Sequence, residues 1–174
     1  MKRRVLIEEK TLQNRVKELA KQISEDYKDK NPLLVGVLKG AFVFMADIIR
    51  EITIPHTLDF MAVSSYGAST TTSGVVRILK DLDAPLFNRH VLIVEDIVDS
   101  GLTLRYIMRL LAARSPASLK VCALLDKTEA HQSMDLVDYR GFEIPNQFVI
   151  GYGLDYDQYY RNLPYIAVFE EKVP

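Results

Sequence analysis

The chain has 174 residues, enough for one substantial hydrophobic core and too few for two full domains. Its 22 Lys and Arg residues balance 23 Asp and Glu residues, so no global positive field directs it to nucleic acid or to an anionic membrane. The single cysteine excludes an internal disulfide, and the apolar run before Glu8 is too short for a signal peptide. We therefore expect a cytoplasmic protein that does not associate with membranes.

Residues 11–28 carry the first strong helical pattern. Apolar side chains recur on one face at spacings of three and four, while lysines and acidic residues occupy the other face. This pattern is typical of a surface helix that lies against a sheet, with an inward face formed by Val16, Leu19, Ala20, Ile23 and Tyr27. Proline disfavours a helical conformation in the preceding residue, so the Asn31-Pro32 pair predicts the end of the helix.

Two strands and a helix are expected next. The apolar run 33–38 predicts a buried strand, and a Lys39-Gly40 turn then leads into an apolar helix over residues 41–49. The pattern over residues 57–63 predicts a second strand.

Residues 64–74 have few apolar side chains to bury. They contain three Thr, four Ser and two Gly, a composition that predicts a mobile loop. An extended segment is expected over residues 75–79, followed by a polar turn.

The stretch VLIVEDIVDSGLT carries the most specific pattern in the chain. Its apolar residues 91–94 predict a strand buried on both faces of a parallel sheet, and helical spacing resumes at Thr103. The turn between them would present hydroxyls and unpaired backbone N–H groups at a helix N-terminus, where the peptide dipoles favour an anion. The neighbouring carboxylates suit hydroxyl groups, a metal ion or substrate protons better than phosphate; they are Glu95, Asp96 and Asp99.

The last third of the chain changes character. Residues 117–125 predict another buried strand, in which Cys122 is expected to be a small apolar core residue rather than a reactive thiol. After Lys127, short aromatic and β-branched segments predict a small subdomain; they lie around Tyr139, Phe142, residues 148–152 and residues 165–169.

Alternating strands and helices over residues 32–127 predict an α/β fold with a mostly parallel sheet flanked by helices. We expect a single domain over residues 1–174. Its core would span about residues 32–127, and the N-terminal segment with residues 128–174 would form a small hood subdomain. Ligands of such sheets bind at the carboxyl ends of the strands, so the polar residues that follow each strand should line one crevice.

VLIVEDIVDSGLT resembles the phosphoribosyl pyrophosphate (PRPP) motif of the type I phosphoribosyltransferases, in which two acidic residues close an apolar strand before Asp-Ser-Gly and Thr. The resemblance implies that Glu95 and Asp96 bind the ribose hydroxyls with Mg²⁺ nearby, and that Asp99 is the general base. It also implies a site for the ribose 5′-phosphate formed by Ser100, Gly101, Leu102 and Thr103.

Two other interpretations fit parts of this motif. An acidic strand-to-helix turn without a ligand would leave three crowded carboxylates repelling one another. A phospho-acceptor receiver domain also contains strands that read VLIVED, but there such a strand opens the domain. Here about half of the chain precedes it, and too little follows for five strands and five helices.

The later segments LLDKT and GFEIPNQFVIGYGLDYDQYYRNLPYI resemble the purine-binding hood of the hypoxanthine-guanine phosphoribosyltransferases, and the whole resemblance runs from Leu33 to Ile166. It implies that Asp155 serves a second Mg²⁺ and that Arg161 contacts pyrophosphate. The implied metal ligands are therefore Glu95, Asp96 and Asp155. The implied purine contacts are Lys127, Phe148, Val149 and Asp155.

The chemistry of two of these residues supports the same conclusion. An ammonium group on Lys127 would select 6-oxo over 6-amino purines, because a purine amino group would be a donor facing a donor, at a cost of about 1 to 3 kcal/mol. Phe148 offers a flat apolar face, and base stacking contributes on the order of 1 to 3 kcal/mol. Considered alone, Phe148 would be assigned to the core, and Lys127 and Arg161 to the surface.

Two further segments complete the resemblance. VLKGAF resembles the family's pyrophosphate-binding loop, which implies PRPP contacts from Lys39 and Gly40 and a cis Leu38-Lys39 bond. A simple strand-to-helix turn that uses Gly40 is an alternative interpretation of this segment from the sequence alone. Ser65 and Tyr66 match the Ser-Tyr of the family's catalytic lid, which would close over the reactive carbon and exclude water.

The implied reaction is purine salvage: transfer of a 5-phosphoribosyl group from PRPP to N9 of hypoxanthine or guanine, with Mg²⁺ as cofactor. A nucleoside monophosphate and pyrophosphate would be the products, and a homodimer or homotetramer the assembly. The sequence does not rank hypoxanthine, guanine and xanthine, since all three carry the 6-oxygen.

Two functions of other classes fit the sequence less well. An RNA-binding regulator of the pyrimidine attenuator type would keep the PRPP motif, but it needs a basic face, which the net charge of −1 disfavours. A small-molecule binding module without turnover would have no use for Asp99, Lys127 and Asp155 together.

Overall fold

The structure is a computed structural model that describes residues 2–65, 76–131 and 135–170. The strands of its larger sheet are β2 (Leu33–Leu38), β3 (Thr57–Ser65), β4 (Val76–Lys80), β5 (His90–Val98), β6 (Ser118–Asp126) and β7 (Tyr139–Glu143). Their spatial order is β4-β3-β2-β5-β6-β7. Only the β3–β4 pairing is antiparallel, and the other four pairings are parallel.

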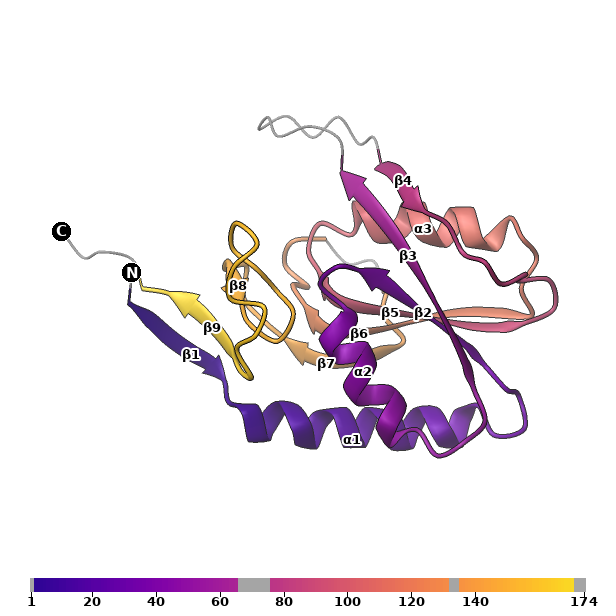
Figure 1. The fold of residues 1–174 in the computed structure, drawn as a ribbon, viewed down its shortest axis with the longest axis horizontal. Helices are drawn as coiled ribbons and strands as arrows, with labels where there is room; N and C mark the ends of the chain where they lie inside the picture. Colours follow the sequence, from indigo (N-terminus) through magenta and orange to yellow (C-terminus); the bar gives the residue numbers. More distant parts are fainter. Residues whose placement is uncertain (1, 66–75, 132–134, 171–174) are drawn as a thin grey trace.

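Three helices cover the large sheet, as Figure 1 shows: α1 (Glu9–Asp26) and α2 (Phe42–Glu51) lie on one face and α3 (Leu102–Ala112) on the other. Strand residues alternate between the two layers, so Leu34 packs with α1 and α2 while Val35 packs with α3. This two-sided burial explains the continuous apolar runs of β2 and β5. Cys122 lies in the fully buried part of β6, where burial raises the pKa of its thiol.

Several sequence predictions are confirmed. β2 has the predicted bounds, and the predicted inward face of α1 is buried. The strand predicted over residues 91–94 is longer than expected. It continues to Val98 because Ile97 and Val98 pair with Leu125 and Asp126 of β6, so Glu95 and Asp96 lie inside the strand rather than after it.

A second, antiparallel sheet joins the two ends of the chain. It contains β1 (Arg3–Ile7), β9 (Ile166–Phe169) and β8 (Val149–Ile150), in the order β1-β9-β8. The placement of Tyr139 and Phe142 in the small subdomain was wrong, because both lie in β7, where they pair with Cys122 and Leu125 of β6. Their aromatic pattern predicted a strand but could not specify which sheet it joins.

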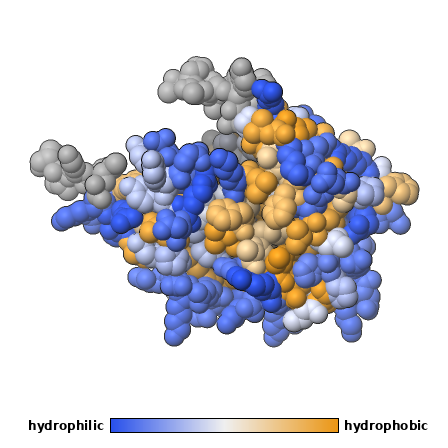
Figure 2. All heavy atoms as spheres, viewed as in Figure 1, coloured by the Kyte–Doolittle hydropathy of each residue, from blue (hydrophilic) through white to orange (hydrophobic). Residues whose placement is uncertain are grey.

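The surface is mixed in polarity. Figure 2 shows apolar side chains across the middle of one face, over β2 and β3 beside α2, within a polar rim. Phe42 of α2 and Leu58 of β3 are 45% and 42% exposed. Within the described residues, no helix is long and apolar enough to cross a membrane.

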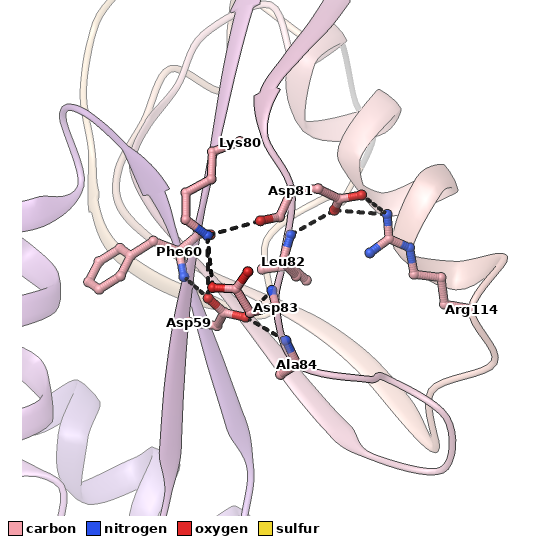
Figure 3. A network of polar contacts seen from close by, with 8 residues as sticks. All are labelled: Asp59, Phe60, Lys80, Asp81, Leu82, Asp83, Ala84 and Arg114. Carbon is pink, nitrogen blue, oxygen red and sulfur yellow. Dashed lines mark hydrogen bonds and ion pairs between the residues drawn. The ribbon is translucent and has the colours of Figure 1, made fainter.

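Asp59 of β3 anchors the segment that follows β4 (Figure 3). One of its carboxylate oxygens accepts the N–H groups of Asp83 and Ala84 at 2.8 and 2.9 Å, and the other accepts the Phe60 N–H at 2.7 Å. Lys80 Nζ lies 3.8 Å away. Burial raises the pKa of Asp59, but the three N–H groups and Lys80 together lower it below its ordinary value.

We predict that Asp59→Asn lowers the free energy of unfolding by about 1 to 2 kcal/mol at neutral pH, because one of the two acceptor oxygens is lost. A lowered folded-state pKa stabilises the fold above the unfolded-state pKa, and this contribution is lost as the pH falls through the folded-state value. The gap between wild type and variant should therefore begin to narrow below about pH 4 and close only as the pH falls through the lower, folded-state pKa.

Urea unfolding at several pH values measures this difference. Asp83→Asn is the matched control, since the Asp83 side chain is 89% exposed and meets Lys80 only at 3.5 Å. Equal stabilities of wild type and Asp59→Asn at pH 7 would contradict the assignment.

Candidate functional site

A cavity of about 280 Å³ opens at the carboxyl ends of β2 and β5. Residues from three predicted segments line it: the Lys39-Gly40 loop, the acidic strand and the Ser-Gly turn. They include Gly40, Glu95, Asp96, Asp99, Ser100 and Thr103. The structure thus brings most of the sequence-predicted PRPP-binding residues to one hollow.

The turn before α3 is shaped for close approach to its backbone. Gly101 has φ of +76°, in the left-handed region, and a Cβ there would lie 2.7 Å from Leu136 Cδ1. The Leu102 N–H, at the first position of α3, points toward Ser100 Oγ at 3.4 Å. Because the first N–H groups of a helix have no intrahelical acceptor, this turn can donate several hydrogen bonds to an anion.

Asp99 and Lys127 form an ion pair at the mouth of the cavity. Lys127 Nζ donates to Asp99 Oδ2 at 2.8 Å, and the lysine side chain is only 7% exposed whereas Asp99 is 57% exposed. The Lys127 backbone N–H donates to Val98 O at 2.9 Å. An ammonium donor and a carboxylate acceptor are therefore held side by side by the paired ends of β5 and β6.

A buried charge cluster lies directly behind Lys127. The Asp126 carboxylate is fully buried and accepts one hydrogen bond from His131 Nε2 and another from Arg140 Nε, each at 2.6 Å. Its backbone oxygen accepts the Ile144 N–H at 3.0 Å. A buried carboxylate needs such partners to offset its desolvation, so the cluster fixes the end of β6 from which Lys127 projects.

Glu95 and Asp96 are adjacent carboxylates with raised pKa values. Burial, and then the neighbouring Asp96 charge, raises the pKa of Glu95 well above its usual range. Burial also raises the pKa of Asp96 to about 6, although the Ile97 N–H and Arg161 act in the opposite direction. A cation beside the pair would favour the ionised forms of both groups.

The carboxylates beside the cavity fit a cation that also coordinates a bound ligand. Among the described residues, no three His, Cys, Asp or Glu side chains gather tightly enough to hold a metal ion by themselves. Glu95, Asp96 and Asp155 therefore do not form a complete protein cage. Mg²⁺ commonly uses one or two carboxylates together with phosphate oxygens and water, which this arrangement could supply.

The hood loop, residues 151–161, meets the Lys39-Gly40 loop through close backbone contact and through the hydrogen bond from Lys39 Nζ to Gln158 Oε1 at 3.2 Å. A Cβ on Gly40 would lie 1.7 Å from Asp96 Oδ2, and a Cβ on Gly153, where φ is +98°, would lie 2.2 Å from Gly40 O. Arg161 donates to Gly153 O at 2.8 Å and pairs with Asp155 at 3.1 Å. Lys39, Asp155 and Arg161 are thereby gathered beside the cavity, and the Leu38-Lys39 bond is cis, as the resemblance implied.

Two of the predicted purine contacts, Phe148 and Val149, do not line this cavity. Phe148 is 57% exposed, meets Tyr156 edge-on with ring centroids 5.8 Å apart, and lines a separate hollow near Arg4. Val149 is buried in β8. Of the predicted lid pair, Tyr66 lies outside the described residues and Ser65 is described only through its backbone in β3.

Three residues of the site could not be found by sequence reasoning: His131, Arg140 and Gln158. His131 and Arg140 meet Asp126 only through the fold, and Gln158 accepts a hydrogen bond from Lys39, 119 residues away in the sequence. No spacing rule connects such partners.

Comparison with known proteins shows the family to which the chain belongs. The model of the phosphoribosyl transferase domain matches residues 7–157. A hypoxanthine-guanine phosphoribosyltransferase of Dictyostelium discoideum is 52% identical over 176 residues, covering 99% of this chain and 98% of the relative. This chain belongs to the hypoxanthine-guanine phosphoribosyltransferase family. The member from Bacillus subtilis (strain 168) is 51% identical, with 98% and 94% of the two chains covered.

A solved structure of this family has the same fold. The hypoxanthine-guanine phosphoribosyltransferase of Bacillus anthracis superposes with a TM-score of 0.91 at 46% identity, covering 96% of this chain and 98% of that chain. In the phosphoribosyltransferase described here, the matched residues 7–157 contain the acidic strand, the Ser-Gly turn, Lys127 and Asp155. Arg161 lies beyond them.

Proposed function

We propose that the protein catalyses Mg²⁺-dependent transfer of a 5-phosphoribosyl group from PRPP to N9 of hypoxanthine or guanine. The observation that carries this proposal is the Lys127–Asp99 pair, held at 2.8 Å beside a turn built to bind phosphate. A 6-oxopurine has an acceptor at O6 and, in its N7–H form, a donor at N7 on the same edge. The purine can therefore replace the ion pair with one hydrogen bond to each partner.

This edge also explains discrimination between purines. Lys127 has only donors and Asp99, when ionised, only accepts, so the pair matches an acceptor and a donor in a fixed order. Adenine places an amino donor where O6 would be, which leaves two donors facing each other. The mismatch should cost about 1 to 3 kcal/mol, which corresponds to a preference of roughly 5- to 150-fold.

The residues divide the reaction between them. Ser100, Gly101 and Thr103 would hold the ribose 5′-phosphate, and Lys39 and Arg161 the pyrophosphate. As the purine N9 lone pair forms a bond to the ribosyl carbon, the bond from that carbon to pyrophosphate breaks and Asp99 accepts the N7 proton. The cationic sugar that develops is stabilised by the nearby carboxylates.

Glu95 and Asp96 would hold one Mg²⁺, and Asp155 would serve a second. When bound, these ions would neutralise charge on the departing pyrophosphate. The raised pKa values of the adjacent carboxylates support this assignment, because a nearby cation would favour the ionised forms of two crowded acids. We also propose that the purine base stacks on Phe148, because the Phe148 ring is exposed and free to make that contact.

Incubation with PRPP, Mg²⁺ and each purine tests the reaction through release of pyrophosphate. We expect turnover with hypoxanthine or guanine, roughly 5- to 150-fold less efficient turnover with adenine, and little release without a purine. Equal release in the absence of purine would indicate hydrolysis of PRPP rather than transfer. No release with any oxopurine would contradict the proposed function.

We predict that Lys127→Ala lowers kcat/KM for hypoxanthine by roughly 10- to 150-fold, since a charge-assisted hydrogen bond contributes about 1.5 to 3 kcal/mol. Activity with adenine should fall much less, because adenine gains nothing from the ammonium group. Lys120→Ala is the control, since Lys120 is an exposed lysine at the other end of β6. Equal losses with both purines would show that Lys127 does not read the 6-position.

We also propose that the protein assembles as a homodimer or homotetramer. The exposed apolar area over β2 and β3 supports an interface with a second copy (Figure 2). Leu58 of β3 and Phe42 of α2 are exposed apolar side chains on these elements. Sedimentation velocity should show a dimer or larger species, and Leu58→Asp should shift it toward monomer. A wild-type protein that sediments only as a monomer at micromolar concentration would contradict the assembly.

A further inference from the structure

One amide oxygen lies between the two cations assigned to pyrophosphate. Gln158 Oε1 accepts a hydrogen bond from Lys39 Nζ at 3.2 Å and another from Arg161 Nη2 at 3.1 Å. Lysine and arginine carry only donors, so the oxygen of the amide, and not its nitrogen, must face them. Lys39 is 119 residues from Gln158 in the sequence and Arg161 is 3 residues from it. The amide oxygen of Gln158 bridges the two cations.

The backbone holds Gln158 in this position. Its φ is +70°, in the left-handed region, and its N–H donates to Asp155 Oδ2 at 2.8 Å. The other oxygen of Asp155 pairs with Arg161 at 3.1 Å. Gln158 is thus anchored by the same carboxylate that orients one of its two cationic partners.

The charge of the group favours an anion. Lys39 and Arg161 contribute two positive charges, Asp155 contributes one negative charge, and Gln158 contributes none. A neutral acceptor can hold two cations near each other without cancelling their charge. A carboxylate at the same place would form ion pairs with both and would compete with an incoming anion.

We propose that Gln158 is a positioning residue of the pyrophosphate subsite. Its amide oxygen occupies the position between Lys39 and Arg161 that an oxygen of bound pyrophosphate would take. This inference rests on the proposed function, which assigns those two cations to pyrophosphate. The amide holds both donors at the spacing that a bridging oxygen requires and gives way to the anion at little electrostatic cost. Its neutrality is the property that matters.

Titration calorimetry with inorganic pyrophosphate and Mg²⁺ tests the inference without turnover. Gln158→Glu has nearly the same shape and adds one negative charge, so it should weaken pyrophosphate binding by about tenfold, or ~1.4 kcal/mol. Gln158→Ala removes the bridge but adds no charge, and should weaken binding only about two- to threefold. Asn162→Glu adds the same charge on an exposed neighbour and should leave binding within about twofold of wild type.

Steady-state kinetics adds a measurement that a merely structural role would not change. In Gln158→Glu, KM for PRPP should rise about tenfold while KM for hypoxanthine stays near the wild-type value. A parallel rise of both KM values would overturn the inference. So would pyrophosphate binding that is weakened no more by Gln158→Glu than by Gln158→Ala or Asn162→Glu.

The two proposals can fail separately. Pyrophosphate binding that follows the expected order in a protein without transferase activity would support the role of Gln158 and contradict the proposed function. Transferase activity with pyrophosphate binding that is insensitive to Gln158→Glu would contradict the role of Gln158 alone.

Discussion

The parallel pairing of β5 with β6 is the constraint on which the site depends. Because Val98 pairs with Asp126, the next residues, Asp99 and Lys127, leave the two strands at the same level. The bond from the Lys127 N–H to Val98 O extends this pairing by one residue. A slip of one residue would turn every side chain of β6 to the opposite face. The acid–base pair is therefore set by strand register, with the buried Asp126 cluster securing the end of β6.

Two glycines matter to the site as much as its charged side chains do. Gly40 lets the Asp96 carboxylate approach its backbone, and Gly153 lets the hood loop rest on Gly40 O. A Cβ on Gly40 would displace the Asp96 carboxylate, and a Cβ on Gly153 would push the hood loop, with Asp155 and Arg161, away from the Lys39-Gly40 loop. The two loops thus meet through close backbone contact where pyrophosphate is proposed to bind, and the Lys39–Gln158 hydrogen bond adds a side-chain contact at the same place.

The sequence predicted those parts of the fold in which one physical signal dominates. The apolar run of β2 gave its bounds, and the helical spacing after Thr103 placed α3. The end of β5 was missed because Glu95 and Asp96 interrupt the apolar pattern, although both carboxylates lie in a paired strand. The sequence also predicted that Lys39, Asp99 and Lys127 lie close together, because each follows the carboxyl end of a parallel strand. The partnerships of His131 with Asp126 and of Gln158 with Lys39 could not be predicted in this way, because only the folded chain brings those side chains together.

The pairing of β1 with β9 has a consequence for the order of folding. β1 precedes every strand of the large sheet in the sequence and β9 follows every one of them, so the pair Arg3–Phe169 closes a very long loop. Closing a long loop costs more conformational entropy than joining strands that are near in the sequence, so the large sheet should form before the small one. Until the small sheet forms, β1 presents an unpaired strand edge.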